Sequence, residues 1–212
     1  MGKVNYFITF TNIRAAYYTF FASYLRTMDI RSAEPYTEIE LINGCVRRDP
    51  KAQKYLYEKY SSKMLAVCYR YTGNRDEAQD LLHDGFISLF DKIKSYSGTG
   101  SFEGWMRKYF VNVSLMHLRK RDILKFPEDF STVDREISDN PSVLDNIAVK
   151  DLLKLIASMP TGFRTVFNLY VIEGFSHQEI GKMLNITESS SRSQLSRDRE
   201  WLKDSLSGLS NK

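Results

Sequence analysis

The sequence is poor in cysteine and has no long apolar run. Its two cysteines, Cys45 and Cys68, form no C-x-x-C pair backed by histidines, so we predict two buried free thiols in a reducing cytoplasm. A membrane-spanning helix needs about 20 mostly apolar residues. In the aromatic first thirty residues Asn12 and Arg14 interrupt the apolar sequence, and no A-x-A cleavage site follows. These features disfavour a membrane span and a secretory signal. We treat residues 1–34 as an N-terminal extension without an assigned role.

Signatures of catalysis are also missing. The three histidines, His83, His117 and His177, fall in separate predicted helices without metal-ligand spacing. No Ser-His-Asp, Walker or paired-carboxylate pattern occurs. The sequence therefore predicts a protein that is not an enzyme and has no metal, cofactor or small-molecule substrate. The net charge of +4 is compatible with a polyanionic partner.

Strand alternation and Gly-rich βαβ patterns are absent too, and the periodicity that remains is helical. It extends over residues 35–121 and returns over residues 148–208. Between these ranges, residues 122–147 contain seven acidic and two basic residues, with Pro127 and Pro141, which is typical of an extended linker. We predict an all-α fold of two small helical domains joined by an acidic linker.

In the first domain, the run Asn74-Arg75-Asp76-Glu77 predicts a helix start with Asn74 as N-cap. Apolar residues then recur at three- and four-residue steps, which predicts one buried stripe. A second side of the same helix is acidic with an apolar spot. It is either a solvated surface or a docking surface for a basic partner. The buried stripe comprises Leu82, Phe86, Leu89, Phe90 and Ile93, and the second side comprises Asp80, Asp84, Ile87 and Asp91.

A Gly-Ser loop, residues 95–101, leads into a helix over 102–121 that mixes aromatic and basic residues. Core-like spacing favours packing roles for its aromatics. A basic helix beside a mobile loop with Tyr96 also suits single-stranded DNA, with a polar residue such as Asn112 at a base edge. The core-like positions are Phe102, Trp105, Tyr109 and Val113, and the candidate phosphate contacts are Arg107, Lys108, Arg119, Lys120 and Arg121.

The second domain carries the stronger signal. A helix over 161–173 is followed by Gly174, suited to a C′ position, and the capping box at 176–179 opens a short helix that ends at Leu184. After a tight turn, Thr187 can cap a helix over 188–206. Two helices joined by such a turn form a helix-turn-helix, whose second helix enters the major groove. The alternative is a helical bundle with merely solvated arginines.

The order of these parts resembles the extracytoplasmic-function (ECF) family of RNA polymerase sigma factors, over about residues 39–206. The segment 80–86 resembles the helix that docks on the polymerase β′ subunit, 102–121 the helix that melts and reads the −10 promoter element, and 173–188 the module that reads the −35 element. The resemblance implies a cytoplasmic protein whose partners are core polymerase, through β′ and β, and promoter DNA. The resemblance also implies an anti-sigma factor as a partner, for which no feature of the sequence gives a binding site.

The resemblance also assigns site residues. Asn112 falls on the family's polar position near the captured base, and the loop 95–101 falls where that base is held. A LuxR-like helix-turn-helix regulator, which would bind duplex operators without polymerase, is the alternative. The expected contacts are Asp80, Asp84, Ile87 and Asp91 for core polymerase, Tyr96, Ser97, Trp105, Lys108, Asn112, Arg119 and Lys120 for the −10 element, and Ser190, Arg192, Ser193, Ser196 and Arg197 for the −35 element.

Four positions depart from the family pattern. Ser191 stands where valine is usual, Gln194 where a basic residue is usual and Asp198 where a small residue is usual. These three bear on the details of −35 preference. Met116 replaces a commonly acidic residue of the −10 helix.

Overall fold

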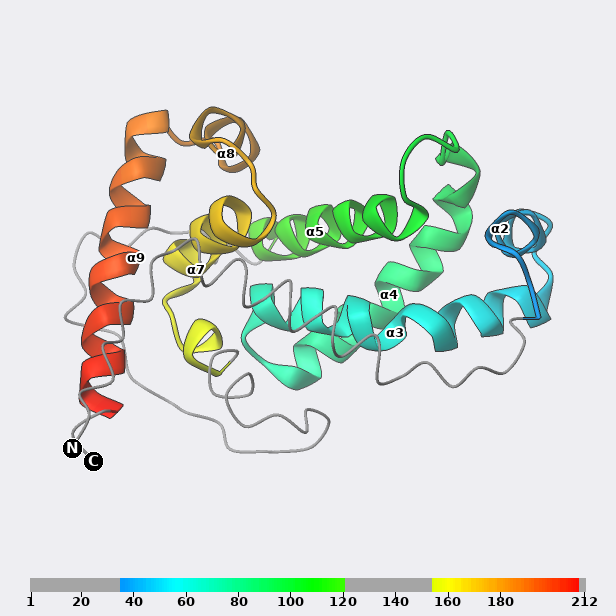
Figure 1. Cartoon of the computed structure of the whole chain (residues 1–212), viewed down its shortest axis with the longest axis horizontal. Coiled ribbons are helices and arrows are strands. Elements are labelled where there is room, and N and C mark those ends of the chain that lie inside the picture. Colours follow the sequence, from blue (N-terminus) through cyan, green and yellow to red (C-terminus); the bar gives the residue numbers. More distant parts are fainter. Residues whose placement is uncertain (1–34, 121–153, 210–212) are drawn as a thin grey trace, which may run out of the picture.

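The computed structural model describes residues 35–120 and 154–209, whose regular structure is helical. We call residues 35–120 the first module and residues 154–209 the second module. The N-terminal extension and the predicted acidic linker lie outside the described residues. The elements of the first module are α2 (Glu38–Val46), α3 (Pro50–Thr72), α4 (Arg75–Lys92), the 3-10 turn η1 (Ile93–Ser95) and α5 (Phe102–Lys120); those of the second are α7 (Thr161–Phe167), the π-helix η3 (Asn168–Ile172), α8 (His177–Leu184) and α9 (Glu188–Leu209) (Figure 1).

Local capping signals set the helix boundaries of the first module. The predicted N-cap is confirmed, because the Asn74 side chain accepts hydrogen bonds from the backbone of Asp76 and Glu77 at 2.9 and 3.0 Å. Gly73 ends α3 with φ 71°, a left-handed conformation that costs glycine little. One residue therefore closes α3 and the next opens α4. No helix in 35–120 or 154–209 is both long and apolar enough to cross a membrane.

The core of the first module lies where α3, α4 and α5 pack together. Phe86 of α4 meets Phe110 of α5 with ring centroids 5.1 Å apart. A Cβ at Gly85 would collide with the Phe110 ring, so this glycine lets α4 and α5 approach closely. The predicted α4 stripe is confirmed, with Phe90 half-buried and its other members buried.

The predicted core register of α5 is wrong by about one residue. Phe102 is buried as expected, but Trp105, Tyr109 and Val113 are only half-buried. Two adjacent stripes of this helix are apolar, and only packing against α3 and α4 selects the one that faces inward. The side chains that α5 buries are Phe102, Met106, Phe110, Val111, Ser114, Leu115 and Leu118.

Both cysteines are free and buried, as predicted. Burial raises the pKa of Cys45 to about 11 and that of Cys68 to about 12, so neither forms the reactive thiolate at neutral pH. We expect iodoacetamide at pH 8 to leave the native protein unmodified and to alkylate both thiols in guanidinium chloride, as measured by intact mass. Rapid labelling of either thiol in the native protein would contradict this environment.

The second module contains the predicted helix-turn-helix. The capping box is present, since Ser176 accepts from the Glu179 backbone at 3.2 Å and its own N–H donates to the Glu179 carboxylate at 2.8 Å. Asn185 ends α8 with φ 57°, and the Thr187 hydroxyl accepts from the backbone N–H of Ser190 at 3.0 Å. The predicted helix over 161–173 is correct in extent, but its second half is the π-helix η3.

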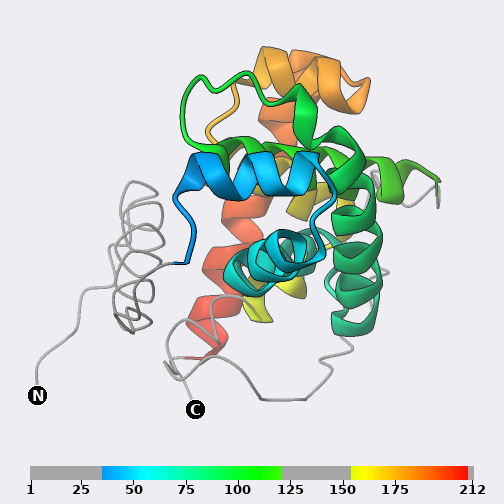
Figure 2. The ribbon, with the colours of Figure 1, turned by 90° about the vertical axis from the view of Figure 1, so that its right-hand side faces the viewer.

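The two modules touch. Helix α7 packs against both α9 and α3, and buried apolar side chains of both modules belong to one continuous cluster. Figure 2, in which α3 is seen nearly end-on, shows the second module behind the first. Nothing in the sequence predicted this contact.

Candidate nucleic-acid interface

The outward side of α5 carries a stripe of exposed residues. Lys108, Asn112, Met116 and Arg119 are all exposed, and their spacing of three and four residues places them on one side of the helix. Lys120 is exposed beside them. We call these five residues the α5 stripe. It contains four of the predicted −10 contacts, together with Met116. The Met116 side chain is 66% exposed and places an apolar group among basic side chains and the Asn112 amide.

Aromatic rings form a row next to the start of this stripe. Trp105 stacks on Phe102 with centroids 5.6 Å apart and on Tyr109 at 6.0 Å. Tyr96 reaches the row from the loop, 5.5 Å from the Trp105 centroid. Tyr96, Trp105 and Tyr109 are only half-buried, so part of each ring is accessible. Trp105 and Tyr109 remain at the surface because α5 turns the neighbouring stripe, which contains Met106 and Phe110, toward the core.

The loop before α5 folds on itself. The Tyr96 hydroxyl donates to the carbonyl of Gly100 at 2.6 Å, and the hydroxyls of Ser97 and Thr99 lie 2.6 Å apart. Gly100 and the neighbouring Gly98 have φ 76°, and a Cβ on either would meet nothing within 4 Å. The structure thus brings Tyr96 and Ser97 to an open loop at the end of the aromatic row.

Arg107 differs from the other basic residues of α5. Its guanidinium lies 3.8 Å from the Glu103 carboxylate, which also accepts from Lys63 of α3 at 2.7 Å. The Arg107 side chain is only 17% exposed. Arg107, one of the candidate phosphate contacts, is therefore directed at the protein. Arg121, another candidate, lies outside the described residues.

The predicted acidic face of α4 is exposed. Asp80, Asp84 and Asp91 are at the surface, and Ile87 among them is 67% exposed. Asp91 accepts a hydrogen bond from Arg48 at 3.0 Å in an exposed ion pair, which contributes about 0–1 kcal/mol. The face thus offers negative charge around an unshielded apolar side chain.

Helix α9, the second helix of the helix-turn-helix, exposes all five predicted −35 residues: Ser190, Arg192, Ser193, Ser196 and Arg197. Arg192 donates to the carboxylate of Glu188 at 2.5 Å, one helical turn earlier. Both side chains remain about half exposed or more, so this ion pair contributes at most about 1 kcal/mol.

The opposite side of α9 explains three of the departures from the family pattern. Ser191, Gln194 and Asp198 are all buried, so they take part in packing and do not belong to the exposed side of α9. His177 of α8 bonds the Ser191 hydroxyl through Nδ1 at 2.9 Å and stacks on Tyr170 at 4.3 Å. The family's usual valine lacks this hydroxyl, so Ser191 allows a polar link between the two helices of the motif.

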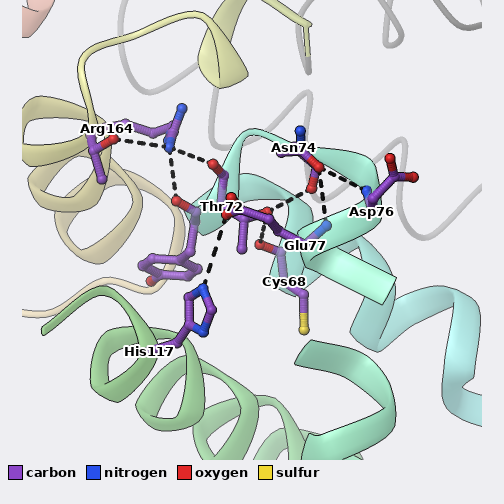
Figure 3. A network of polar contacts seen from close by, with 9 residues as sticks. Cys68, Thr72, Asn74, Asp76, Glu77, His117 and Arg164 are labelled. Atoms are coloured by element: carbon purple, nitrogen blue, oxygen red, sulfur yellow. Dashed lines mark hydrogen bonds and ion pairs between the residues drawn. The ribbon is translucent and has the colours of Figure 1, made fainter. Parts of the chain in front are cut away.

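The contact between the modules was missed because no pattern in a single sequence pairs residues 93 positions apart. Arg164 of α7 is buried and donates to the carbonyls of Tyr71 and Thr72, at 2.9 and 3.0 Å (Figure 3). Burial lowers the pKa of Arg164 to about 10. A basic residue inside a predicted helix does not indicate which distant carbonyl groups it will bond.

Two family models match the chain. Sigma-70 region 2 matches residues 56–123, and Sigma-70, region 4 matches residues 150–202. Together they cover more than half of the sequence. A LuxR-like regulator would leave the region 2 match without an explanation.

Curated relatives agree with these matches. The chain is 33% identical over 156 residues to the ECF RNA polymerase sigma factor SigE of Mycolicibacterium smegmatis, covering 71% of this chain and 60% of that protein. It is 27% identical to the ECF RNA polymerase sigma factor SigW of Bacillus subtilis, covering 76% and 92%. A solved structure of the sigma factor RpoE with the anti-sigma factor NepR from Bartonella quintana matches with TM-score 0.47 and 18% identity, covering 73% and 96%. On the sequence matches, the chain belongs to the ECF family of sigma-70-type sigma factors.

Proposed function

We propose that this chain is a promoter-specificity subunit of RNA polymerase, in which the first module binds core polymerase and the melted −10 strand while the second reads the −35 duplex. It acts in the cytoplasm by binding, without catalysis or a cofactor. The observation that carries the proposal is the α5 stripe beside the row of half-buried aromatic rings. Family membership supports the same role.

The α5 surface suits an unpaired strand for three physical reasons. Phosphates attract the exposed cations Lys108, Arg119 and Lys120. Unstacked bases offer π-faces to accessible rings such as Trp105, and each such stacking contact is worth about 1–3 kcal/mol. The amide of Asn112 can both donate to and accept from a base edge, which phosphate contacts alone cannot read.

The α4 face suits the polymerase. Asp80, Asp84 and Asp91 surround the exposed Ile87, which is the pattern of an apolar anchor with charged groups that orient a basic partner. We assign this face to the β′ subunit. Contacts with β and with an anti-sigma factor are expected from family habit, and no described residue is assigned to them.

Reconstitution with core polymerase tests the function directly. We expect the purified protein to co-elute with core enzyme and to direct run-off transcription from a promoter mapped with that complex. Scrambling either the −10 or the −35 element should abolish the transcript. Failure to bind core polymerase, together with tight binding to duplex operators by the protein alone, would refute the proposal in favour of the LuxR-like alternative.

Asn112→Ala is expected to change −10 base preference more than overall activity. Loss of the amide removes a base-edge hydrogen bond while the basic and aromatic neighbours remain. Run-off transcription on single-base −10 variants should show discrimination at one position falling by about 1–3 kcal/mol. Asn43→Ala, at an exposed position of α2, is the matched control. An unchanged preference profile would remove Asn112 from the reading surface.

Arg192→Ala and Arg197→Ala should each weaken binding to the −35 element by about 1–3 kcal/mol, because an arginine on the reading helix bonds guanine or phosphate. Competition with a scrambled duplex separates base contact from phosphate contact. Loss of a base contact lowers the preference for the −35 sequence over the scrambled one, whereas loss of a phosphate contact weakens binding to both. The control is Arg47→Ala, an exposed arginine of the first module. Transcription that is equal from intact and −35-scrambled promoters would contradict both assignments.

A further inference from the structure

One buried hydrogen bond joins the two helices of the helix-turn-helix. His177 begins α8, Ser191 lies in the first turn of α9, and the imidazole Nδ1 is 2.9 Å from the serine Oγ. Ser191 is 0% exposed and His177 is 8% exposed, so water cannot readily take the place of either group. Loss of one group would leave the other buried without this bond, which destabilises the arrangement.

The imidazole of this bond is held in place by a third element. It stacks on the ring of Tyr170, which belongs to η3, with centroids 4.3 Å apart and 18° between the ring planes. Rotation of the imidazole out of this plane would disturb the stacking and the hydrogen bond together. One side chain of α8 therefore connects η3 to α9.

Helix α9 buries mostly polar side chains. In the part of α9 whose side chains the structure describes, the buried residues are Ser191, Gln194, Leu195 and Asp198. A contact between apolar groups has no preferred direction, whereas a hydrogen bond weakens steeply as its angle departs from linearity. Because three of the four buried side chains are polar, directional contacts contribute strongly to the orientation of α9.

The bond is well placed to fix the angle between α8 and α9, which lie side by side at the start of α9 (Figure 1). The helices also approach closely at the turn, where a Cβ at Gly181 would lie 2.8 Å from the carbonyl oxygen of Ile186. A contact at the turn alone would leave a pivot there. His177 is the first residue of α8 and lies about 10 Å along the helix axis from its end, so its bond with Ser191 restrains that pivot.

The exposed side of α9 depends on this angle. Ser190 and Arg192 flank Ser191 in the chain, and both are exposed and are expected −35 contacts. A tilt of α9 at Ser191 would move both side chains relative to the DNA groove. A shift of about 1 Å is enough to lose a hydrogen bond to a base edge, whereas attraction to phosphates acts over a longer range. The angle therefore affects sequence preference more than total affinity.

We propose that His177 is a positioning residue for −35 recognition, and that its hydrogen bond with Ser191 sets the angle of α9 and thereby the preference for one −35 sequence over others. This inference rests on the proposed function, because it concerns how the second module distinguishes one duplex from another. The hydrogen bond itself does not depend on that function.

Ser191→Ala tests the bond in the complex of the full chain with core polymerase. The quantity measured is discrimination, the ratio of the affinities for a promoter with an intact −35 element and for one with a scrambled element. Ser191→Ala should lower discrimination by about 10-fold, because the buried imidazole loses the partner that holds α9 in its reading orientation. Affinity for the scrambled promoter should change little, since the phosphate contacts remain.

The matched control is Thr165→Val, which removes another fully buried hydroxyl of the second module. The Thr165 hydroxyl donates to the Thr161 carbonyl at 2.7 Å, so its bond stays within one helical segment. Thermal unfolding should show that both substitutions lower stability, and only Ser191→Ala should lower discrimination. Equal discrimination by the two variants would overturn the positioning role.

Two substitutions of His177 separate the hydrogen bond from the stacking. His177→Asn keeps a polar group near the position of Nδ1 and loses the ring, whereas His177→Phe keeps a ring against Tyr170 and loses the polar group. We expect His177→Asn to retain more discrimination than His177→Phe, which should fall about as far as Ser191→Ala. The reverse order, or equal discrimination by the two variants, would overturn the role of the hydrogen bond.

Nitrogen NMR of the imidazole detects the bond in the free full-length protein, without DNA. The Nδ1 resonance of His177 is assigned by its loss in His177→Asn. It should move in Ser191→Ala and stay in place in Thr165→Val. A resonance that does not respond to Ser191→Ala would contradict the bond and overturn the proposal.

The two proposals fail in distinguishable ways. If the unaltered protein binds core polymerase and discriminates between −35 elements, but Ser191→Ala discriminates equally well, the positioning role is refuted and the proposed function stands. If the unaltered protein does not bind core polymerase, the proposed function is refuted and the role of His177 in −35 recognition falls with it, even where the nitrogen spectrum shows the bond.

Discussion

Asp80→Arg combined with Asp84→Arg is expected to weaken binding to core polymerase by about 100-fold, and to reduce transcription at limiting protein concentration in proportion. Both aspartates are exposed and belong to the α4 face around Ile87. Reversing two charges places like charges opposite a basic partner, which costs several kcal/mol. The affinity can be measured by competition with a labelled sigma factor for core enzyme.

Salt dependence and a charge control sharpen this result. Because the interaction is electrostatic, the difference between the double variant and the unaltered protein should shrink as ionic strength rises. Glu38→Arg with Glu58→Arg makes the same net charge change at exposed positions of α2 and α3, and it should leave the affinity nearly unchanged. Equal affinity of the α4 double variant and this control would remove the polymerase role from the α4 face.

Phe110→Ala is expected to lower the free energy of unfolding by about 3–5 kcal/mol, the usual cost of removing a fully buried aromatic ring. Phe110 is 0% exposed, packs on Phe86 at 5.1 Å and fills the space that Gly85 leaves open. Since small domains are stable by only about 5–15 kcal/mol, much of the first module's stability would be lost. Denaturant titration followed by circular dichroism measures the change.

The same substitution should impair both binding surfaces of the first module. The ring joins the inward side of α5 to α4, so its loss loosens the support of the α5 stripe and of the acidic α4 face together. Met116→Ala, on the exposed side of the same helix, should change stability by less than about 0.5 kcal/mol. A Phe110→Ala protein as stable as Met116→Ala would show that α5 is not held by this contact.

Much of the local structure of the candidate interface was predictable from the sequence, because helix caps and exposed helix sides both depend on residues close together in the chain. Asn74, Ser176 and Thr187 cap helices wherever those helices lie, since the partners of a cap are within three residues. The exposed positions of α4 and α9 follow from helical periodicity once one apolar stripe is recognised. The same logic failed on α5, where two neighbouring stripes are apolar and periodicity alone cannot choose between them.

The sequence alone determined the main helices, their caps, the helix-turn-helix and the exposed acidic side of α4, because each depends on neighbours a few positions away. The tertiary structure decided which side of α5 faces the core, that Gln194 lies inward, and that Arg70 and Glu173 meet. These outcomes depend on packing and on the desolvation of charges between segments as much as 103 residues apart. No periodic pattern encodes such a pairing, because the energy that selects it arises only when the two surfaces exclude water from each other.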